Sequence, residues 1–537
     1  MKLILRYCRE LIHTYPLLFA KAIAMILLIT ALNTAIPCGM RYYIDAVTAN
    51  GSILMIIAGL LLFAACMLLG TCLEIRWYIQ LDEMGGRYIT DITIDAEQVL
   101  AYASHRHVDE MRPDRLKHML YADILDIFRV LGHHIPSLAG HLCTILISFL
   151  LAACFHWQFA LILLLSSAGG FFLSFYSRKM ISQKAGMTNQ KLKTHHAHCN
   201  EYVDSLPLIQ TNDIISYFCN RSKAGIHDFI EASQKENRTA VFWGKAIGNY
   251  NTLFTILLSA LLVLPAVGGN IVNLVFFTML SGIVTSTSQQ AELLLQQIIK
   301  ASVSFENIEA IRALPKRQGE QPLTHIAHVE FQNVVFTYPG AQIPALRDIS
   351  CRLSQGDFIR LTGGNGSGKS TFIKLLTGIY APDSGRILVN GLDLSLCRQE
   401  DLNRQILYIN QDETMLNETM KTYVELISGH AIAPGEWGPL SAKAGLSAPS
   451  DRDIENNGLS LSVGQRKKLL ILKLLLRAEE ASVIILDEVE AGLDADTKAR
   501  FLSILNDLVS KRDKIILMIE HTEEQNIPFD RVMEFGL

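Results

Sequence analysis

Half of the 537 residues are hydrophobic and the mean hydropathy is +0.25, so the chain is apolar on average and has room for two or more domains. The formal net charge of −4 shows no basic character, which argues against nucleic acid as a partner. The 10 cysteines include no Cys-x-x-Cys pair, which argues against a disulfide framework or a zinc site.

The apolar residues gather in six runs before residue 300. These runs are residues 17–36, 53–73, 135–155, 159–176, 250–267 and 271–288. Each is close to the ~20 residues that cross a bilayer as a helix. A single run would also fit a buried helix of a soluble protein, but six in succession predict an α-helical membrane domain of six transmembrane helices. Because a second run follows the first so soon, we interpret the first as a span and not as a cleaved signal peptide.

Lysine and arginine are distributed unevenly between these runs. Three precede the first run, seven lie in residues 74–134 and ten in residues 177–249, whereas the alternate connections hold only Arg41. Positive charge favours the cytoplasmic side of a membrane. We therefore expect a multi-pass protein of the inner (plasma) membrane, with its N-terminus and everything after the sixth span in the cytoplasm. The two long connections have helical patterning and are predicted to extend the spans as cytoplasmic arms.

A different pattern begins after residue 312. Residues 313–325 are polar, contain two prolines and are typical of a linker. Beyond them, short apolar runs such as DFIRLT, SVIILD and KIILMIE are bounded by polar residues, which predicts buried parallel strands alternating with helices. The sequence thus predicts a membrane domain at 1–312, a linker at 313–322 and an α/β domain at 323–537.

The segment GGNGSGKST, residues 363–371, follows one of these predicted strands and precedes a predicted helix. It has P-loop spacing at Gly363, Gly368, Lys369 and Ser370. Glycines let a backbone wrap a phosphate without Cβ clashes, and the N-terminus of the following helix attracts the same anion. We expect Lys369 to reach the β- and γ-phosphates and Ser370 to bind Mg²⁺. The α/β domain is therefore predicted to be a P-loop ATPase.

Two carboxylates end the apolar strand VIILDE, residues 483–488. Alone, paired acids after a strand fit the solvated start of a helix. Together with a P-loop, they fit a second phosphate-site motif, in which Asp487 holds Mg²⁺ through water. Glu488 would then act as the general base toward the attacking water.

The order of the P-loop, Gln411, LSVGQ at 461–465, ILDE at 485–488 and His521 resembles the nucleotide-binding domain of ATP-binding cassette (ABC) transporters over about residues 323–537. Six spans with long cytoplasmic arms resemble the membrane domain of the exporter type. The whole chain thus resembles an exporter-type half-transporter. A shorter resemblance, in the P-loop and LSVGQRKK segments, is to bacterial exporters of cyclic or modified peptides.

This resemblance implies a role for each matching position. Tyr338 would stack on adenine, Gln411 would sense Mg²⁺ and contact the membrane domain, and His521 would contact the γ-phosphate. The catalytic set would be Glu488, His521 and Lys369. ATP would lie against Tyr338, Gly363, Asn365, Gly366, Ser367, Gly368, Lys369, Ser370, Thr371, Gln411, Ser462, Gly464 and Gln465, and Mg²⁺ against Ser370, Gln411 and Asp487.

In the family, two cassettes pair head to tail, and each ATP lies between the P-loop of one and the signature of the other. One chain carries one cassette, so the resemblance implies a homodimer. Two departures from the family's motifs bear on the rate of ATP hydrolysis. Val463 replaces the first glycine of the usual LSGGQ signature, and AGLD at 491–494 replaces a loop that often begins with serine and alanine. Because Glu488 and His521 are present, we still expect an active ATPase.

The sequence says less about the cargo. Asn33, Asn251, Asn273, Gln289 and Gln290 lie in or near the spans, where such residues line a pore or form interhelical hydrogen bonds. Glu292 is expected to line a cytoplasmic vestibule. In HHAHC, residues 195–199, His195, His198 and Cys199 are either soft-metal ligands or an ordinary solvated helix face.

The favoured interpretation is an ATP-driven exporter of a peptide or peptide-like metabolite, embedded in the lipid bilayer. The alternatives are an importer of siderophore-like cargo on the same fold and a membrane-anchored regulator whose cassette only senses ATP.

Overall fold

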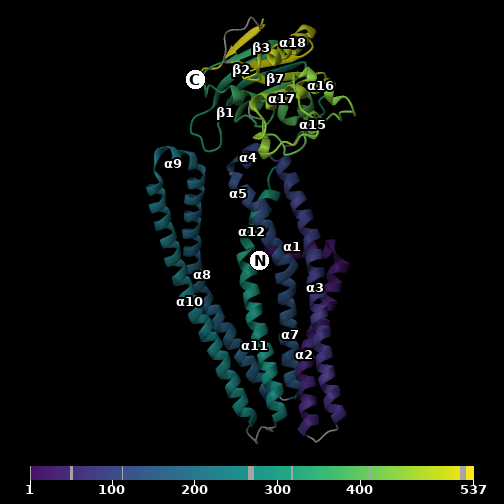
Figure 1. The fold of residues 1–537 in the computed structure, drawn as a ribbon, viewed down its shortest axis with the longest axis vertical. Helices are drawn as coiled ribbons and strands as arrows, with labels where there is room; N and C mark the ends of the chain where they lie inside the picture. Colours follow the sequence, from purple (N-terminus) through teal and green to yellow (C-terminus); the bar gives the residue numbers. More distant parts are fainter. Residues whose placement is uncertain are drawn as a thin grey trace. The chain divides into compact units, whose positions relative to one another are not determined.

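The computed structural model describes residues 2–48, 53–111, 113–155, 157–263, 271–315, 319–410, 413–490, 492–520 and 528–536. The chain divides into two compact units. The first, here called the membrane unit, comprises Met1–Ala96 and Lys117–Ala310, and the second, the cassette unit, comprises Glu97–Leu116 and Ile311–Leu537. Figure 1 shows that the first is built from long helices and the second from strands and shorter helices.

The membrane unit is helical throughout its described residues, and several of its helices continue into the cassette unit. The elements are α1 (Lys2–Thr14), α2 (Pro16–Thr48), α3 (Ile53–Tyr102), α5 (Pro113–His118), the π-helical turn η1 (Met119–Asp123), α6 (Ile124–Phe128), the π-helical turn η2 (Arg129–His134), α7 (Ile135–Phe155), α8 (Trp157–Asp204), α9 (Leu206–Asn212), α10 (Ile215–Val263), α11 (Ile271–Lys300) and α12 (Ser302–Arg312).

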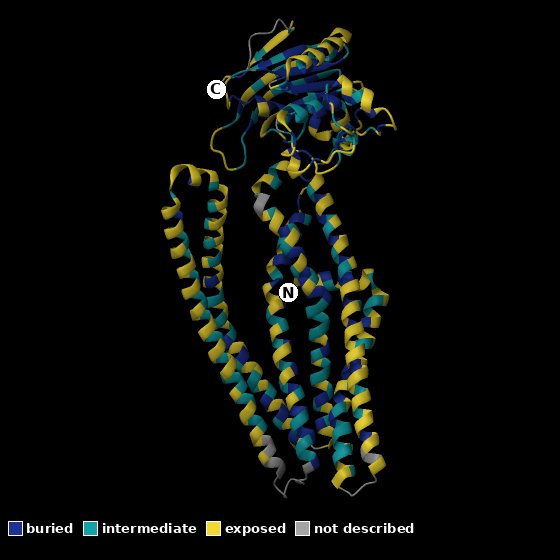
Figure 2. Cartoon of the chain, viewed as in Figure 1, coloured by how far each residue is buried: buried dark blue, intermediate teal, exposed yellow. Residues whose placement is uncertain are grey.

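The six apolar runs of the sequence fall in α2, α3, α7, α8, α10 and α11, although residues 264–267 of the fifth run lie outside the described residues. In the described part of the chain, four helical segments are long and apolar enough to cross a membrane. They are Pro16–Thr48, Ile57–Tyr102, Arg115–Phe155 and Trp157–Asp204. Figure 2 shows long exposed faces on these helices, as expected of surfaces that lipid covers.

The predicted helical arms are confirmed, since α8 and α10 have 48 and 49 residues, far more than a bilayer requires. The two helices lie side by side and are joined through the short α9 (Figure 1). Elsewhere in the unit, α11 packs on α2 and α7 around a small aromatic core that contains Phe159, Phe276 and Phe277, each no more than 1% exposed.

The cassette unit contains two sheets. One has the order β2-β1-β4-β5 and antiparallel pairs, and the other has the order β6-β7-β8-β3-β9 and parallel pairs. The strands are β1 (His328–Phe336), β2 (Leu346–Ser354), β3 (Phe358–Thr362), β4 (Ser384–Val389), β5 (Leu392–Asp393), β6 (Ile406–Ile409), β7 (Val483–Asp487), β8 (Ile515–Ile519) and β9 (Arg531–Glu534). The predicted layer of buried parallel strands is confirmed.

The helices of this unit are α4, α13 to α18 and two 3₁₀ turns. Their bounds are α4 (His105–Glu110), α13 (Lys369–Leu376), η4 (Leu394–Leu396), α14 (Gln399–Gln405), α15 (Met420–Ser428), α16 (Trp437–Lys443), η5 (Asn456–Gly458), α17 (Val463–Arg477) and α18 (Ala495–Lys511). Strand β7 is apolar from Val483 to Leu486 because both of its faces are covered there. Val483 and Ile485 belong to one hydrophobic core, and Ile484 and Leu486 to another that includes α17.

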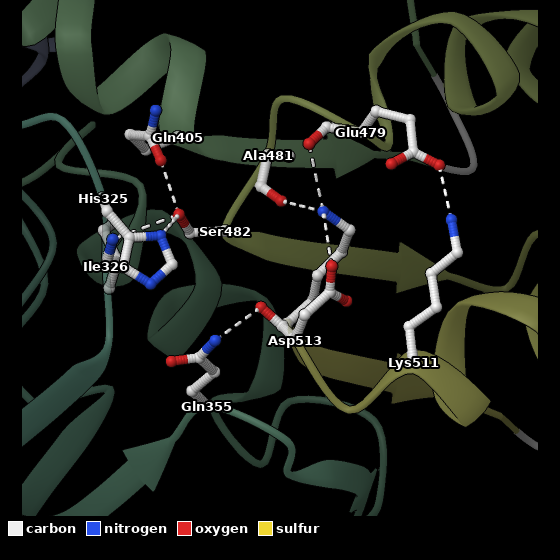
Figure 3. A network of polar contacts seen from close by, with 10 residues as sticks. His325, Ile326, Gln355, Gln405, Glu479, Ala481, Ser482, Lys511 and Asp513 are labelled. Carbon is white, nitrogen blue, oxygen red and sulfur yellow. Dashed lines mark hydrogen bonds and ion pairs between the residues drawn. The ribbon is translucent and has the colours of Figure 1, made fainter.

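A polar network ties the amino ends of β7 and β8 together (Figure 3). The Lys514 ammonium, which is 5% exposed, donates to the carbonyl oxygens of Ala481 at 2.9 Å and Glu479 at 3.2 Å. The Ser482 hydroxyl accepts a hydrogen bond from the Ile326 backbone N–H at 3.1 Å. These bonds stabilise the amino end of the parallel sheet, and the candidate functional residues lie at its carboxyl end.

Candidate functional site

The P-loop lies between β3 and α13, as the sequence predicts. Gly363 and Gly368 have φ values of 143° and 103°. A Cβ on Gly363 would stand 2.4 Å from the Phe535 carbonyl oxygen, and a Cβ on Gly368 would stand 2.8 Å from that of Ala345. Only glycine fits both the backbone conformation and the space. The loop therefore presents bare backbone, which is the form that a phosphate-binding cradle requires.

Lys369 begins α13 and is 9% exposed. Its ammonium donates to the carbonyl oxygens of Gly363 at 2.6 Å and Gly364 at 3.1 Å, so it lies across the loop. Ser370 is exposed in the first turn of α13, and Thr371 beside it is buried. The remaining predicted contacts, Asn365, Gly366 and Ser367, complete the same loop, with Asn365 and Gly366 exposed and Ser367 buried.

The acidic residues stand at the carboxyl end of β7. In the parallel sheet, β8 alone separates β7 from β3, so Asp487 and the P-loop emerge from the same edge. Tyr408, in β6, donates its hydroxyl to the Asp487 carboxylate at 3.0 Å. Glu488 follows with φ of 49°, a left-handed conformation that is uncommon for a residue other than glycine. Its backbone N–H donates to the Ile519 carbonyl oxygen at 3.2 Å.

The signature segment begins α17. Ser462 is its N-cap, and the Ser462 hydroxyl accepts from the Gln465 backbone N–H at 3.2 Å. The Gln465 side chain accepts in return from the Ser462 N–H at 3.1 Å. This capping box shows that the two residues also stabilise the start of the helix. Ser462 and Val463 are exposed, whereas Gly464 and Gln465 are half-buried.

The predicted adenine-stacking residue, Tyr338, is half-buried beside the P-loop helix. Its hydroxyl lies 3.2 Å from that of Thr371, and its ring meets the Tyr380 ring edge-on at a centroid distance of 5.5 Å. The Lys374 ammonium lies 5.4 Å from the centre of the Tyr338 ring. The Tyr338 ring is thus held by its hydroxyl contact, by the Tyr380 ring and by Lys374 over one of its faces.

Helix α4 contacts the cassette beside this aromatic group. The Tyr380 hydroxyl donates to the Asp109 carboxylate, and burial together with this bond raises the pKa of Tyr380. The Arg106 guanidinium pairs with Asp383 at 2.6 Å, and the other oxygen of Asp383 accepts the Thr337 backbone N–H at 2.7 Å. Two sets of contacts, one through Tyr380 and one through Asp383 and Thr337, thus connect α4 with Tyr338.

The loop after Glu488 leads into α18, whose N-cap is Asp494. Lys468 pairs with this carboxylate at 2.9 Å, and this bond, followed by that from the Thr497 N–H, holds the pKa of Asp494 well below its usual range. A Cβ on Gly492 would stand 4.0 Å from Val463 Cγ1, so the altered signature and the altered AGLD loop are neighbours within one chain.

Some predicted residues lie outside the described part of the chain, namely Gln411, His521 and Ala491. Their positions in the sequence follow β6, β8 and β7, three neighbouring strands of the parallel sheet. The sequence interpretation missed two contacts of the acidic residues. They are the hydrogen bond from Tyr408 to Asp487 and the hydrogen bond from Lys467 to the backbone of Glu488. Lys467 gives no distinct signal in the sequence, because it stands between Arg466 and Lys468 in the charged run RKK of α17.

The residues present fit ATP with Mg²⁺. The glycine cradle leaves room for phosphate oxygens, Lys369 supplies a positive charge, and Ser370 and Asp487 supply the oxygen ligands that Mg²⁺ prefers. No group of three or more potential metal ligands of the His, Cys, Asp and Glu types occurs in the described residues. The predicted Mg²⁺ site is compatible with this, because it relies on a serine, a glutamine and a single carboxylate.

The two units match the two parts of one known family. Residues 19–288, about half of the chain, match the ABC transporter transmembrane region, and residues 346–491 match the ABC transporter family itself. The chain belongs to the ABC transporter family. With a membrane region and a nucleotide-binding cassette fused in one chain, it is an exporter-type half-transporter.

Solved structures and curated relatives agree. A bacterial Atm1-family ABC exporter with ATP bound superposes with a TM-score of 0.82 over 97% of this chain and 94% of that one, at 18% identity, which shows a shared fold. The ATP-dependent lipid A-core flippase of Photobacterium profundum is 34% identical over 200 residues, and that of Escherichia coli K12 is 32% identical over 196 residues. These matches span 36% and 35% of this chain and only about a third of each relative, 34% and 33%.

The membrane unit of this half-transporter contains a partly open cavity of about 560 Å³. Of the predicted pore residues, Asn251 and Gln289 line it, together with Glu292. Asn33 does not line it, and its side-chain oxygen instead lies 3.6 Å from where a Cβ on Gly70 would stand. Asn33 therefore lies where α2 meets α3.

The HHAHC segment lies on α8. His195 Nε2 is 3.5 Å from Cys199 Sγ, and the Nδ1 atoms of His195 and His198 both lie near Gly225 of α10. The histidines thus contribute to packing between the two arms. Two imidazoles and one thiol in this arrangement do not form a metal-binding group.

Proposed function

We propose that this half-transporter is an ATP-driven exporter that works as a homodimer. The observation that carries the proposal is the incomplete nucleotide site of one chain. The P-loop, Asp487 and Glu488 share one edge of the sheet, while Ser462 is exposed at the start of α17. An exposed helix N-terminus with a hydroxyl cap is suited to bind the phosphates held by a second chain. Two identical chains would complete two sites.

At each site, the chain's own residues would divide the work. Tyr338 would stack on adenine, and the P-loop with Lys369 would hold the phosphates. Ser370 and Asp487 would hold Mg²⁺, which when bound neutralises phosphate charge. Glu488 would accept the proton of the attacking water. His521 and Gln411 keep the roles that the family implies, contact with the γ-phosphate and contact with Mg²⁺ and the membrane domain.

The tip of the α8–α10 hairpin supports the same assembly. Here Val203, Leu208, Ile215 and Tyr217 are between 47% and 60% exposed. These apolar side chains flank α9, beyond the apolar runs that would lie in the membrane. An apolar group in water favours a protein partner, and we propose that the second copy covers it. The proposed topology places the hairpin tip and the cassette in the cytoplasm, with domains at 1–312 and 323–537 joined by the linker.

The cavity favours an amphipathic cargo with a large apolar part. Its wall is dominated by apolar side chains, among them Phe171, Phe172 and Phe175, while Asn251 on α10 and the neighbouring Gln289 and Glu292 on α11 are polar. Apolar walls bind the bulk of a ligand, and a few polar groups orient it. The relatives are named for lipid A-core and not for a peptide, so a lipid-like amphiphile replaces a peptide as our preferred cargo.

Reconstitution of the purified chain in vesicles tests the proposal. We expect ATP hydrolysis by the chain alone, together with ATP-dependent movement of a fluorescent amphiphile away from the side that carries the cassette. Movement toward that side would favour the importer alternative. A chain that binds ATP but does not hydrolyse it would favour the regulator alternative. Hydrolysis only after addition of a second, different half-transporter would exclude the homodimer.

A further inference from the structure

Helix α17 carries two lysines that point into the protein. Lys467 is 4% exposed and Lys473 is 9% exposed. Lysine is rarely buried unless its ammonium is paired. Lys473 pairs with the Glu413 carboxylate at 2.7 and 2.9 Å and also donates to the Tyr408 carbonyl oxygen. Lys467 has a different partner, since its ammonium donates to the backbone carbonyl oxygen of Glu488 at 2.8 Å.

Glu488 occupies a backbone conformation that needs support. Its φ of 49° is costly for a residue with a Cβ and persists only where the surroundings impose it. Its N–H is held by the Ile519 carbonyl at the end of β8, and its carbonyl by Lys467. Both backbone polar groups are thus held from outside β7. Because φ and ψ fix the direction of the Cα–Cβ bond, these bonds also set the direction in which the Glu488 side chain leaves the backbone.

We infer that Lys467 is a positioning residue for the catalytic base. Its hydrogen bond holds Glu488 in the left-handed conformation that presents the carboxylate to the attacking water. A charged donor is suited to this task, because a charge-assisted hydrogen bond is about twice as strong as a neutral one. The Lys467 ammonium is also buried, so a solvent molecule would not replace it at low cost. The inference rests on the proposed role of Glu488.

The position of Lys467 on α17 gives the bond a second consequence. Ser462, the exposed cap of the same helix, lies five residues earlier and in the proposed homodimer faces the ATP of the partner. Lys467 faces the base that serves the chain's own ATP. A displacement of α17 by the partner's nucleotide would therefore reach Glu488 through the Lys467 hydrogen bond, which links the two sites.

Two substitutions at this position separate positioning from packing. Lys467→Met keeps an unbranched side chain and loses the donor, whereas Lys467→Gln keeps a neutral donor. We expect Lys467→Met to lower kcat about 10- to 100-fold, the loss that a displacement of about 1 Å at a catalytic group causes. KM for ATP should stay within about threefold, and Lys467→Gln should recover a large part of kcat. Lys511→Met, an exposed lysine paired with Glu479, is the matched control and should leave kcat unchanged.

A second measurement asks whether Lys467 acts through Glu488. Lys467→Met is added to Glu488→Gln, where the base is already lost, and we expect no further loss of turnover. A further loss of about the same factor in that background would overturn the inference, as would a normal kcat for Lys467→Met. If Lys467→Met does not fold, the smaller loss of kcat caused by Lys467→Gln is compared in the two backgrounds, and an equal loss in both would overturn the inference. Near-normal turnover of Glu488→Gln alone would instead refute the proposed base, so the two failures are distinguishable.

Discussion

Strand β7 has a buried lysine at each end, and the two lysines make the same kind of bond with different consequences. At the amino end, Lys514 is 5% exposed and donates to the carbonyl oxygens of Glu479 and Ala481. At the carboxyl end, Lys467 is 4% exposed and donates to the carbonyl oxygen of Glu488. In a parallel sheet, ligands bind at the carboxyl ends of the strands. The same ammonium-to-carbonyl bond therefore serves stability at one end and catalysis at the other.

At the carboxyl end of β7, a substitution of Glu488 itself should have the largest effect on ATP turnover. Glutamine keeps the shape of the side chain but cannot act as a useful base, and general-base assistance typically contributes about 10²- to 10⁴-fold. We expect Glu488→Gln to lose about that factor in ATP turnover while it still binds ATP. ATPase rate and bound nucleotide, measured on the same preparation, check this. Near-normal turnover would show that the catalytic base lies elsewhere.

Lys369→Ala should affect binding at the same end of the sheet. The substitution removes the P-loop ammonium, and hydrogen bonds to charged groups contribute about 1.5–3 kcal/mol. We expect nucleotide affinity to fall about 10- to 100-fold, so that Glu488→Gln retains ATP and Lys369→Ala releases it. Titration with a fluorescent ATP analogue measures both variants, and equal affinities would contradict the division between binding and chemistry.

Lys514→Met tests the amino end. Loss of the ammonium leaves buried carbonyl oxygens without this donor, which costs about 1–3 kcal/mol. We expect a lower thermal midpoint for the full chain and an unchanged kcat per folded molecule. Lys467→Met should instead have its larger effect on kcat and its smaller effect on the thermal midpoint. If Lys514→Met reduced kcat as strongly as Lys467→Met does, the distinction between the two ends of β7 would be lost.

The smallest expected effect is that of Val463→Gly, which restores the usual signature sequence. Val463 is 53% exposed, and even a Cβ placed on Gly492 would stand 4.0 Å from Val463 Cγ1. A glycine in the first turn of α17 costs no more than about 1 kcal/mol in helix propensity. We expect the ATPase rate to change by no more than a few-fold, and a hundredfold loss would show that the backbone of the signature depends on valine.

The nucleotide-binding parts of this site could be predicted from the sequence because they depend on neighbouring residues. Gly363 and Gly368 permit the backbone angles of the P-loop, and the strand before and the helix after it follow from local periodicity. The six apolar runs could be recognised for the same reason, since a bilayer requires an apolar segment of a particular length. Their continuation into long arms followed from uninterrupted helical patterning.

The tertiary structure alone decided which distant residues support the site. The packing of α17 against the parallel sheet brings Lys467 and Glu488 together. The sequence of neither segment predicts which residues meet in that packing. The same holds for α4, whose residues Arg106 and Asp109 meet the cassette near Tyr338, and for Asn33, whose neutral amide packs against α3 when it could equally have lined the cavity. A local pattern limits which face of an element is buried, but the partner of a buried polar group depends on how two elements dock.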